Sequence, residues 1–429
     1  MNIPLDRLYH FIENIAENIY NDCVIIYRFW PHGSKNIQDL SQLHQNTWFE
    51  TTTLPNIWCH DQEPLDYKYY REHLFEFFKD EFGIALDKIL SKNTNQNLNY
   101  NIGIFSKGIL LHSEQRSNNL KKYEQDNELI PVYYWSHAII ARDWFRYAEH
   151  VSQRKQVERT FLIYSRAWSG TREYRLKFAE LLINLNLQKH CKTSVNPVEP
   201  ELGIHYDSHQ FKNPIWRPQT VLENYFPTST AHSHYSADFD IEDYESTDIE
   251  IVLETLFDDE RLHITEKSLR PIACGQPFML AGTQGSLEYL RGYGFKTFGS
   301  VWDESYDLVE DPAERLIQIA ELMKYISNWT LEEHADKMAQ AQAIADYNRQ
   351  YFFSQEFFNR IVAELETNMA TAFAELNTLP ANQEWVNITN GMLNTPELRA
   401  MLNSGKVMNG LDASTVESAI AIANTLILK

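Results

Sequence analysis

The sequence predicts an α/β protein made of two halves that face a cleft, followed by a helical tail. Short apolar segments of strand length alternate with helical patterns over most of the 429 residues. This alternation is typical of βαβ units in mostly parallel sheets. The length exceeds that of an ordinary single domain and fits two domains with an appendage. We therefore expect domains at 1–155 and 156–375, a small helical tail at 376–429, and ligand binding in the cleft between the halves.

The first half begins with an amphipathic helix and continues with strands. Leu5, Leu8, Ile12, Ile15 and Ile19 recur at helical spacing and form one apolar stripe. A helical region is expected at about 67–90, before an Asn-rich loop. The strand candidates are residues 23–29, 56–60, 100–105, 108–112 and 131–135.

The second half repeats the alternation of strands and helices. A strand at 161–165 leads through a polar turn into a helix, and a loop-rich stretch covers 192–247. A helix is expected from about Thr265 and a short one after Gly285. The remaining apolar segments are strands at 249–255 and 277–281, the short segment 295–298, and a long helical stretch at 312–375.

Composition narrows the class of function and the compartment. The net charge of −21 disfavours a protein that coats nucleic acid, because phosphate contacts need a basic surface. Lys and Arg nevertheless gather in residues 142–177, which could face a phosphorylated ligand. No window is apolar enough to span a membrane, and the opening residues lack a signal-peptide pattern. Four scattered cysteines show no disulfide framework, so we expect a cytoplasmic protein.

The most informative motif is Thr265-Glu266-Lys267, where a helix is expected to begin. The Thr265 hydroxyl can cap the free amides of the first turn. A lysine in a first turn opposes the helix dipole, unless an anion docks there and is bound by the amides and the ammonium together. The Glu266 carboxylate could then accept both hydroxyls of a ribose. A capped surface helix with a solvated Glu and Lys explains the same three residues.

A longer pattern around this motif indicates a family. The residues that carry it are 254–255, 263–267, Pro271, 273–277, 285–290 and 294–295. The pattern resembles the donor-binding segment of fucosyltransferase-like GT-B enzymes, and also uncharacterised glycosyltransferase-like proteins of bacteriophages and marine bacteria. The resemblance implies two Rossmann-like domains facing a cleft, the GT-B fold. It also implies that Glu266 holds the ribose of a nucleotide diphosphate-sugar and Lys267 its diphosphate, with Glu254 in the same pocket.

A second cluster follows the predicted strand at 161–165. Arg166, Gly170, Arg172 and Arg175 lie between this strand and the next helix. Glycine lets the backbone approach a ligand closely, and arginine forks match phosphate oxygens. The cluster resembles the first strand-loop of the donor domain in the same enzymes, where an arginine neutralises the leaving diphosphate. A surface loop with arginines at a helix start is the alternative.

A third cluster, His60, Asp61 and Glu63, follows the strand at 56–60. An inverting transfer needs one base to deprotonate the incoming hydroxyl, and Asp61 or Glu63 could serve, with His60 as a rival. A structural cap at the end of the strand is the alternative. No metal is expected, because neither these residues nor His205, His209, His232 and His234 show diagnostic ligand spacing.

With these motifs, the resemblance implies a glycosyltransferase that moves a sugar from a nucleotide diphosphate-sugar to a hydroxyl acceptor, without a metal and with inversion. The acceptor could be a glycan, lipid, protein or modified DNA. One alternative is a phage-type DNA glycosyltransferase acting on hydroxylated bases, with the basic residues of 142–177 lining a DNA groove. The other is a non-catalytic sugar-nucleotide-binding or assembly protein.

Overall fold

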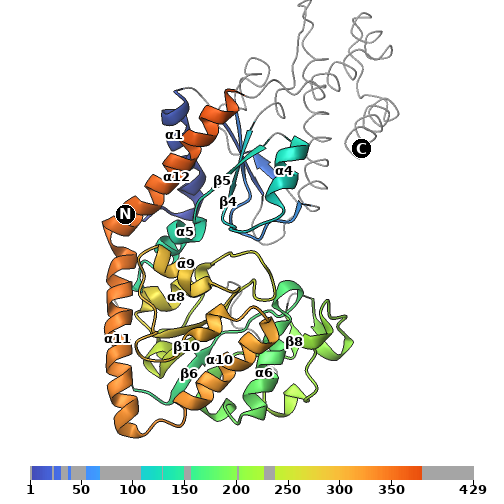
Figure 1. Cartoon of the computed structure of the whole chain (residues 1–429), viewed down its shortest axis with the longest axis vertical. Coiled ribbons are helices and arrows are strands. Elements are labelled where there is room, and N and C mark those ends of the chain that lie inside the picture. Colours follow the sequence, from blue (N-terminus) through green and yellow to red (C-terminus); the bar gives the residue numbers. More distant parts are fainter. Residues whose placement is uncertain are drawn as a thin grey trace, which may run out of the picture. The chain divides into compact units, whose positions relative to one another are not determined.

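The computed structural model describes residues 2–21, 24–29, 37–39, 55–67, 108–127, 129–148, 156–200, 202–226 and 237–378 (Figure 1). These residues form a mixed α/β protein with mainly parallel sheets and a helical C-terminal region. The chain divides into two compact units. Unit 1 comprises Met1–Leu8, Ser113–Ser117 and Trp135–Ala363, and unit 2 comprises Tyr9–His112, Asn118–Tyr134 and Glu364–Lys429.

Unit 2 contains a five-stranded sheet in the order β2-β1-β3-β4-β5. Its strands are β1 (Ile25–Phe29), β2 (Ile37–Asp39), β3 (Asn56–Cys59), β4 (Gly108–His112) and β5 (Leu129–Tyr133). The edge strand β2 is antiparallel to β1, and the other neighbours are parallel. Every residue of β3 and β4 is buried, as expected for parallel strands that are covered on both faces.

Helices α1 and α4 belong mostly or wholly to unit 2. Helix α1 (Leu5–Tyr20) buries Leu8, Ile12 and Ile15, which confirms the apolar stripe expected from the sequence. Helix α4 (Leu120–Asn127) connects β4 to β5 and buries Tyr123.

Unit 1 contains a fully parallel sheet in the order β11-β10-β6-β7. Its strands are β6 (Arg159–Ile163), β7 (Cys191–Thr193), β10 (Thr247–Leu253) and β11 (Phe278–Ala281). Helix α6 (Tyr174–Asn184) connects β6 to β7 on one side, and α8 (Glu266–Cys274) connects β10 to β11 on the other. The winding therefore reverses between β6 and β10, and in such sheets ligands bind beyond the carboxyl ends of the strands at this switch point.

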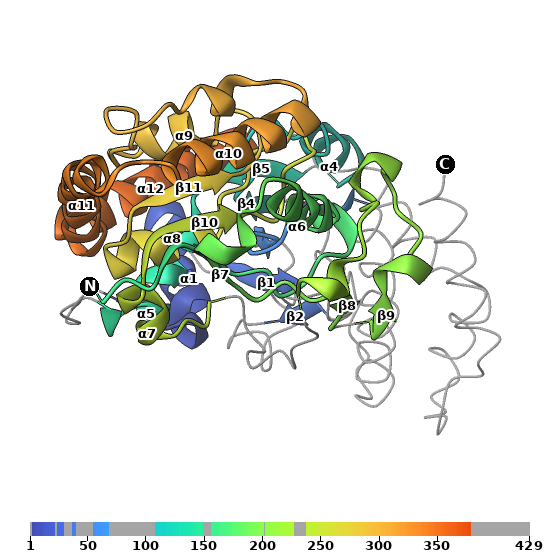
Figure 2. The same ribbon diagram turned by 90° about the horizontal axis from the view of Figure 1, so that it is seen from below.

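The helices of unit 1 cover both faces of its sheet. Helices α6 and α10 (Pro312–Ile326) lie together on one face, and α8 lies on the other (Figure 2). Right-handed crossovers leaving the switch point in opposite directions produce this arrangement. Helix α8 is followed by Gly275, whose φ of 66° provides the left-handed C-cap that glycine adopts without strain.

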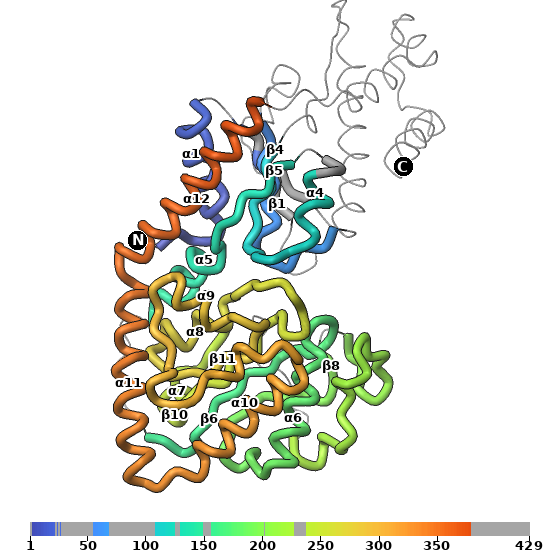
Figure 3. The backbone as a smooth tube through the Cα atoms, in the orientation of Figure 1, coloured from blue at the N-terminus to red at the C-terminus, as the bar shows by residue number. Residues whose placement is uncertain are grey.

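The segment 194–246 separates β7 from β10, and Figure 3 draws its described part up to residue 226 in green. It contains the short antiparallel pair β8 (Val198–Glu199) and β9 (Ile204–His205), and then helix α7 (Ile241–Glu245). Beyond β11 come α9 (Ser286–Gly292), α10, α11 (Leu331–Phe353) and α12 (Gln355–Leu376). Within the described ranges, no helix is long and apolar enough to cross a bilayer.

Most of the predicted strands that fall on described residues are confirmed. Those predicted at 131–135, 161–165 and 249–255 begin and end two residues earlier, as β5, β6 and β10. Both β6 and β10 begin with polar residues, and the first of these, Arg159 and Thr247, pair with each other. Hydrophobicity alone therefore does not mark where these strands start.

The long helical stretch expected at 312–375 is confirmed and consists of three helices, because Asp311, Thr330 and Ser354 cap or interrupt it. The short apolar segment 295–298 is irregular, and its Phe295 and Phe298 fill the core. The predicted strand at 100–105, nearly all of the helical region at 67–90 and most of the tail at 376–429 lie outside the described residues.

Candidate functional site

The switch point of unit 1 is held together by a buried arginine. Arg175, in the first turn of α6, donates to the carbonyl of Ala167 at 2.6 Å and to those of Leu253 and Glu254 at 2.5 and 3.2 Å. Burial lowers the pKa of Arg175, and the neighbouring charge of Arg172 adds to this effect. Arg175 therefore connects the loop after β6 to the end of β10.

The N-terminus of α8 is anchored at this same edge by Glu254. The Glu254 carboxylate is fully buried and accepts from the Thr265 amide at 3.1 Å and the Thr265 hydroxyl at 2.7 Å. It also accepts from the Ser268 hydroxyl at 2.6 Å. Glu254 thus contributes to the site by fixing the start of α8 beyond the carboxyl end of β10.

The three residues of the Thr-Glu-Lys motif lie together at this helix start. Thr265 is the N-cap, and its hydroxyl accepts from the Lys267 amide at 3.3 Å. The Lys267 ammonium lies 2.7 Å from a Glu266 carboxylate oxygen and 3.4 Å from the Thr265 hydroxyl. The predicted cap is therefore confirmed, and an ammonium lies beside the positive end of the helix dipole.

The loop after β6 is shaped by a residue far away in the sequence. The buried carboxylate of Glu199 accepts from the amides of Trp168 and Ser169 at 2.6 and 2.8 Å. Gly170 follows with a φ of 71° and open space where a side chain would lie. Arg172 donates to the Ser169 carbonyl at 3.3 Å, and Arg166 in the same loop is half-buried.

The loop after β11 completes this edge of the sheet. Gly285 has a φ of 84° and precedes α9, whose Leu287 amide donates to the Asp307 carboxylate at 3.1 Å. Burial raises the pKa of Asp307 to about 6, against the hydrogen bond from Leu287, which lowers it. Arg116 donates to the Gln284 carbonyl at 2.6 Å and holds the same loop from a distant part of the chain.

Not all of the basic residues in 142–177 belong to one ligand-facing surface. Arg142 is buried and donates to the carbonyls of Phe352 and Phe353 at the end of α11. Lys177 pairs with Glu180. The expectation of a single phosphate-facing or DNA-facing stretch is therefore too broad, because these side chains serve the fold locally.

In unit 2, His60, Asp61 and Glu63 follow β3, as expected from the sequence. Asp61 is buried, and its carboxylate accepts from the hydroxyls of Tyr9, at 3.1 Å, and Tyr134. His60 is also buried, with Nδ1 3.4 Å from the Tyr123 hydroxyl. Glu63 is half-buried and the most exposed of the three. Burial, and then the charge of Asp61, raises the pKa of Tyr134.

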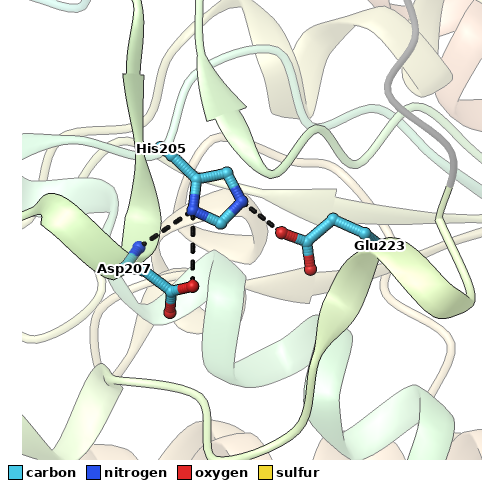
Figure 4. A group of neighbouring side chains, drawn as sticks. All are labelled: His205, Asp207 and Glu223. Carbon is cyan, nitrogen blue, oxygen red and sulfur yellow. Dashed lines mark hydrogen bonds and ion pairs between the residues drawn. The ribbon is translucent and has the colours of Figure 1, made fainter.

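One group of three possible metal ligands occurs among the described residues, namely His205, Asp207 and Glu223. In Figure 4 the imidazole lies between the two carboxylates, with one ring nitrogen facing each. Nδ1 accepts from the Asp207 amide at 3.3 Å, and Nε2 pairs with Glu223. A metal ion would need one ring nitrogen and both carboxylates on the same side, so we interpret this group as a hydrogen-bonded brace. His209 contacts Glu173 instead, while His232 and His234 lie outside the described residues.

Three contributors to the unit 1 site could not be found from the sequence. Glu199 and Arg116 act on main-chain groups of loops that are distant along the chain, and such contacts leave no spacing pattern. His137, from α5 (Ser136–Trp144), lies with its Nε2 3.4 Å from the Glu266 carboxylate. It occurs in an apolar helical segment that shows no motif.

Comparison with protein-family models, curated proteins and solved structures found no match for this chain. The function is therefore argued from the chemistry of the two candidate sites.

Proposed function

We propose that this chain is a glycosyltransferase that uses a nucleoside diphosphate sugar as its donor. The observation that carries the proposal is the set of cationic groups at the switch point of unit 1. Lys267 lies at the capped start of α8, and Arg166 and Arg172 lie in the loop after β6. Helix amides and paired cations are suited to the two phosphates of such a donor.

The same groups supply a chemical reason for transfer. When the bond between the sugar and the β-phosphate breaks, negative charge develops on the departing diphosphate. Lys267, Arg166 and Arg172 would stabilise this charge, because all three follow strands or begin a helix at the carboxyl edge of one sheet. In this proposal the cations do the work for which other transferases use a divalent metal. Glu266 would bind the ribose hydroxyls.

On the acceptor side we favour Glu63 as the base. Asp61 is buried beneath two tyrosine hydroxyls, whereas Glu63 is half-buried and therefore more exposed to an incoming group. The acceptor oxygen would attack the anomeric carbon and pass its proton to Glu63 while the diphosphate leaves from the opposite side. The sugar configuration would be inverted.

The GT-B arrangement is part of the same proposal. Each unit contains a mainly parallel sheet with candidate residues after its strands, which supports two Rossmann-like domains. The donor domain would be unit 1, since its main segment Trp135–Ala363 contains most of residues 156–375.

The proposal is tested by removing the ammonium of Lys267. Nucleoside diphosphate release from UDP-glucose, GDP-mannose, GDP-fucose and dTDP-rhamnose would be measured for the wild-type protein and Lys267→Ala. We expect the best donor to be turned over about 10²-fold more slowly by the variant, a loss of about 3 kcal/mol of transition-state stabilisation. The control is Lys189→Ala. Lys189 is exposed and precedes β7, so it lies at the amino-terminal ends of the strands, away from the proposed site. Equal rates for the wild-type protein and Lys267→Ala would refute the assignment of the donor site.

A further inference from the structure

The start of α5 contacts the residues that precede α8. The indole of Trp135, which precedes α5, donates to the Ile264 carbonyl at 2.9 Å. Its ring packs against Tyr289 and Tyr293 with centroids 5.0 and 4.7 Å apart, so it cannot turn away. All of these residues belong to unit 1. The backbone just before the Thr-Glu-Lys motif is therefore fixed by a neighbouring helix.

Two residues further along, His137 reaches the motif itself. Its Nε2 lies 3.4 Å from one carboxylate oxygen of Glu266, and the Lys267 ammonium lies 2.7 Å from the other. The side chains of His137 and Glu266 are only 3% and 5% exposed. Each oxygen of the carboxylate thus has its own partner, and this fixes the plane of the group.

The neighbours of His137 allow its Nε2 to donate to Glu266. Its Nδ1 lies 3.4 Å from the Ser136 hydroxyl, and that hydroxyl lies 2.7 Å from the Ser113 hydroxyl. If Nδ1 accepts from Ser136, the ring proton is on Nε2 and faces the carboxylate. The edge of the ring packs against His263, with centroids 5.3 Å apart, which limits its rotation.

We propose that His137 is a positioning residue that orients Glu266 to accept the two ribose hydroxyls of a nucleoside diphosphate. A carboxylate accepts along about four lone-pair directions, and the contacts with His137 and Lys267 fix where these directions point. Without the imidazole, the carboxylate would rotate toward Lys267 and lose this alignment. The inference rests on the proposed function and adds that recognition of the ribose depends on α5.

The test separates ribose recognition from general stability. Two variants that both carry a side-chain amide are compared. In His137→Gln the amide can lie near the position of Nε2, whereas in His137→Asn the side chain is one carbon shorter and cannot reach this position. Binding of GDP, UDP, ADP and CDP is measured by calorimetry, each beside its 2′,3′-dideoxy analogue, and circular dichroism confirms folding. The quantity compared is the ratio of the two dissociation constants, which a uniformly weakened site would not change.

We expect the wild-type protein and His137→Gln to prefer the ribonucleotide, and His137→Asn to lose about tenfold of that preference, about 1.4 kcal/mol. Binding of the dideoxy analogue should remain within twofold in both variants. An unchanged ratio in His137→Asn would overturn the positioning role while leaving the proposed function intact. Absence of binding by the folded wild-type protein would instead overturn the proposed function, and the role of His137 with it.

Discussion

Two buried ionisable side chains in unit 1, Arg175 and Glu199, bind main-chain groups. Arg175 donates to carbonyls on two loops, and Glu199 accepts from two amides of the loop after β6. Burying a charge is costly unless hydrogen bonds compensate, so these residues favour one conformation of the loops that they bind. These loops follow β6 and β10 at the switch point of the sheet.

Asp307 makes the stability of this region depend on pH. Its folded-state pKa is about 6, above its ordinary value of 3.8, so the folded state binds the proton more tightly than the unfolded chain. The stabilisation from this proton is fully present below pH 3.8 and is lost as the pH rises through about 6. Two pKa units correspond to a change of up to about 3 kcal/mol in the free energy of unfolding.

Asp307→Asn should remove this dependence, because the amide does not titrate while its oxygen can still accept from Leu287. Urea unfolding of both proteins would be followed by tryptophan fluorescence between pH 4 and pH 7. We expect the stability of the wild-type protein relative to the variant to fall across this range. Parallel pH profiles would show that Asp307 titrates normally in the folded protein.

Of the residues after β3, we expect Asp61 to have a structural role and Glu63 a chemical one. Asp61→Asn leaves an amide where two tyrosine hydroxyls need acceptors, and we expect a loss of about 1–3 kcal/mol in stability. Glu63→Gln should change stability by less than about 0.5 kcal/mol but reduce turnover by about 10²- to 10⁴-fold. Thermal unfolding and nucleoside diphosphate release measure the two effects. Full activity in Glu63→Gln would exclude Glu63 as the base and return attention to His60 and Asp61.

At the scale of the element, α8 depends on its first residue for both capping and anchoring. The Thr265 hydroxyl accepts from the Lys267 amide and donates to Glu254. We expect Thr265→Ala to cost about 1–2 kcal/mol in urea unfolding and to weaken nucleotide binding. Thr265→Ser retains the hydroxyl and should stay close to the wild-type protein. Equal losses in both variants would assign the effect to the methyl group of Thr265 instead of its hydrogen bonds.

The elements also show how much the sequence could predict. The helix starting at Thr265 was predictable because its cap, its apolar face and Gly275 are all local signals. The same holds for β3 and β4, which are short buried runs. The helical stretch at 312–375 was predictable from its composition, whereas its division into three helices depends on capping at Thr330 and Ser354. His137 and Glu199 were missed because only the fold brings them to Glu266 and to the loop after β6.

At the scale of the whole molecule, both units place polar residues after the strands of a mainly parallel sheet. Adjacent residues of the chain serve the two candidate sites. Tyr134 donates to Asp61 in unit 2, and Trp135 donates to Ile264 before α8 in unit 1. One residue that contributes to each site is therefore the direct neighbour, in the chain, of a residue that contributes to the other. No spacing pattern in the sequence indicates these two roles.

If unit 1 binds a nucleoside diphosphate at the carboxyl edge of its sheet, nucleotides should stabilise the folded protein. Thermal unfolding would be measured with UDP, GDP, CDP, dTDP and ADP, each with and without magnesium. A ligand at about 100 times its dissociation constant should add about 2.7 kcal/mol of apparent stability. We expect a clear rise in Tm with at least one nucleotide, of the same size without magnesium. A folded protein whose Tm is unchanged by all five nucleotides would rule out this binding site.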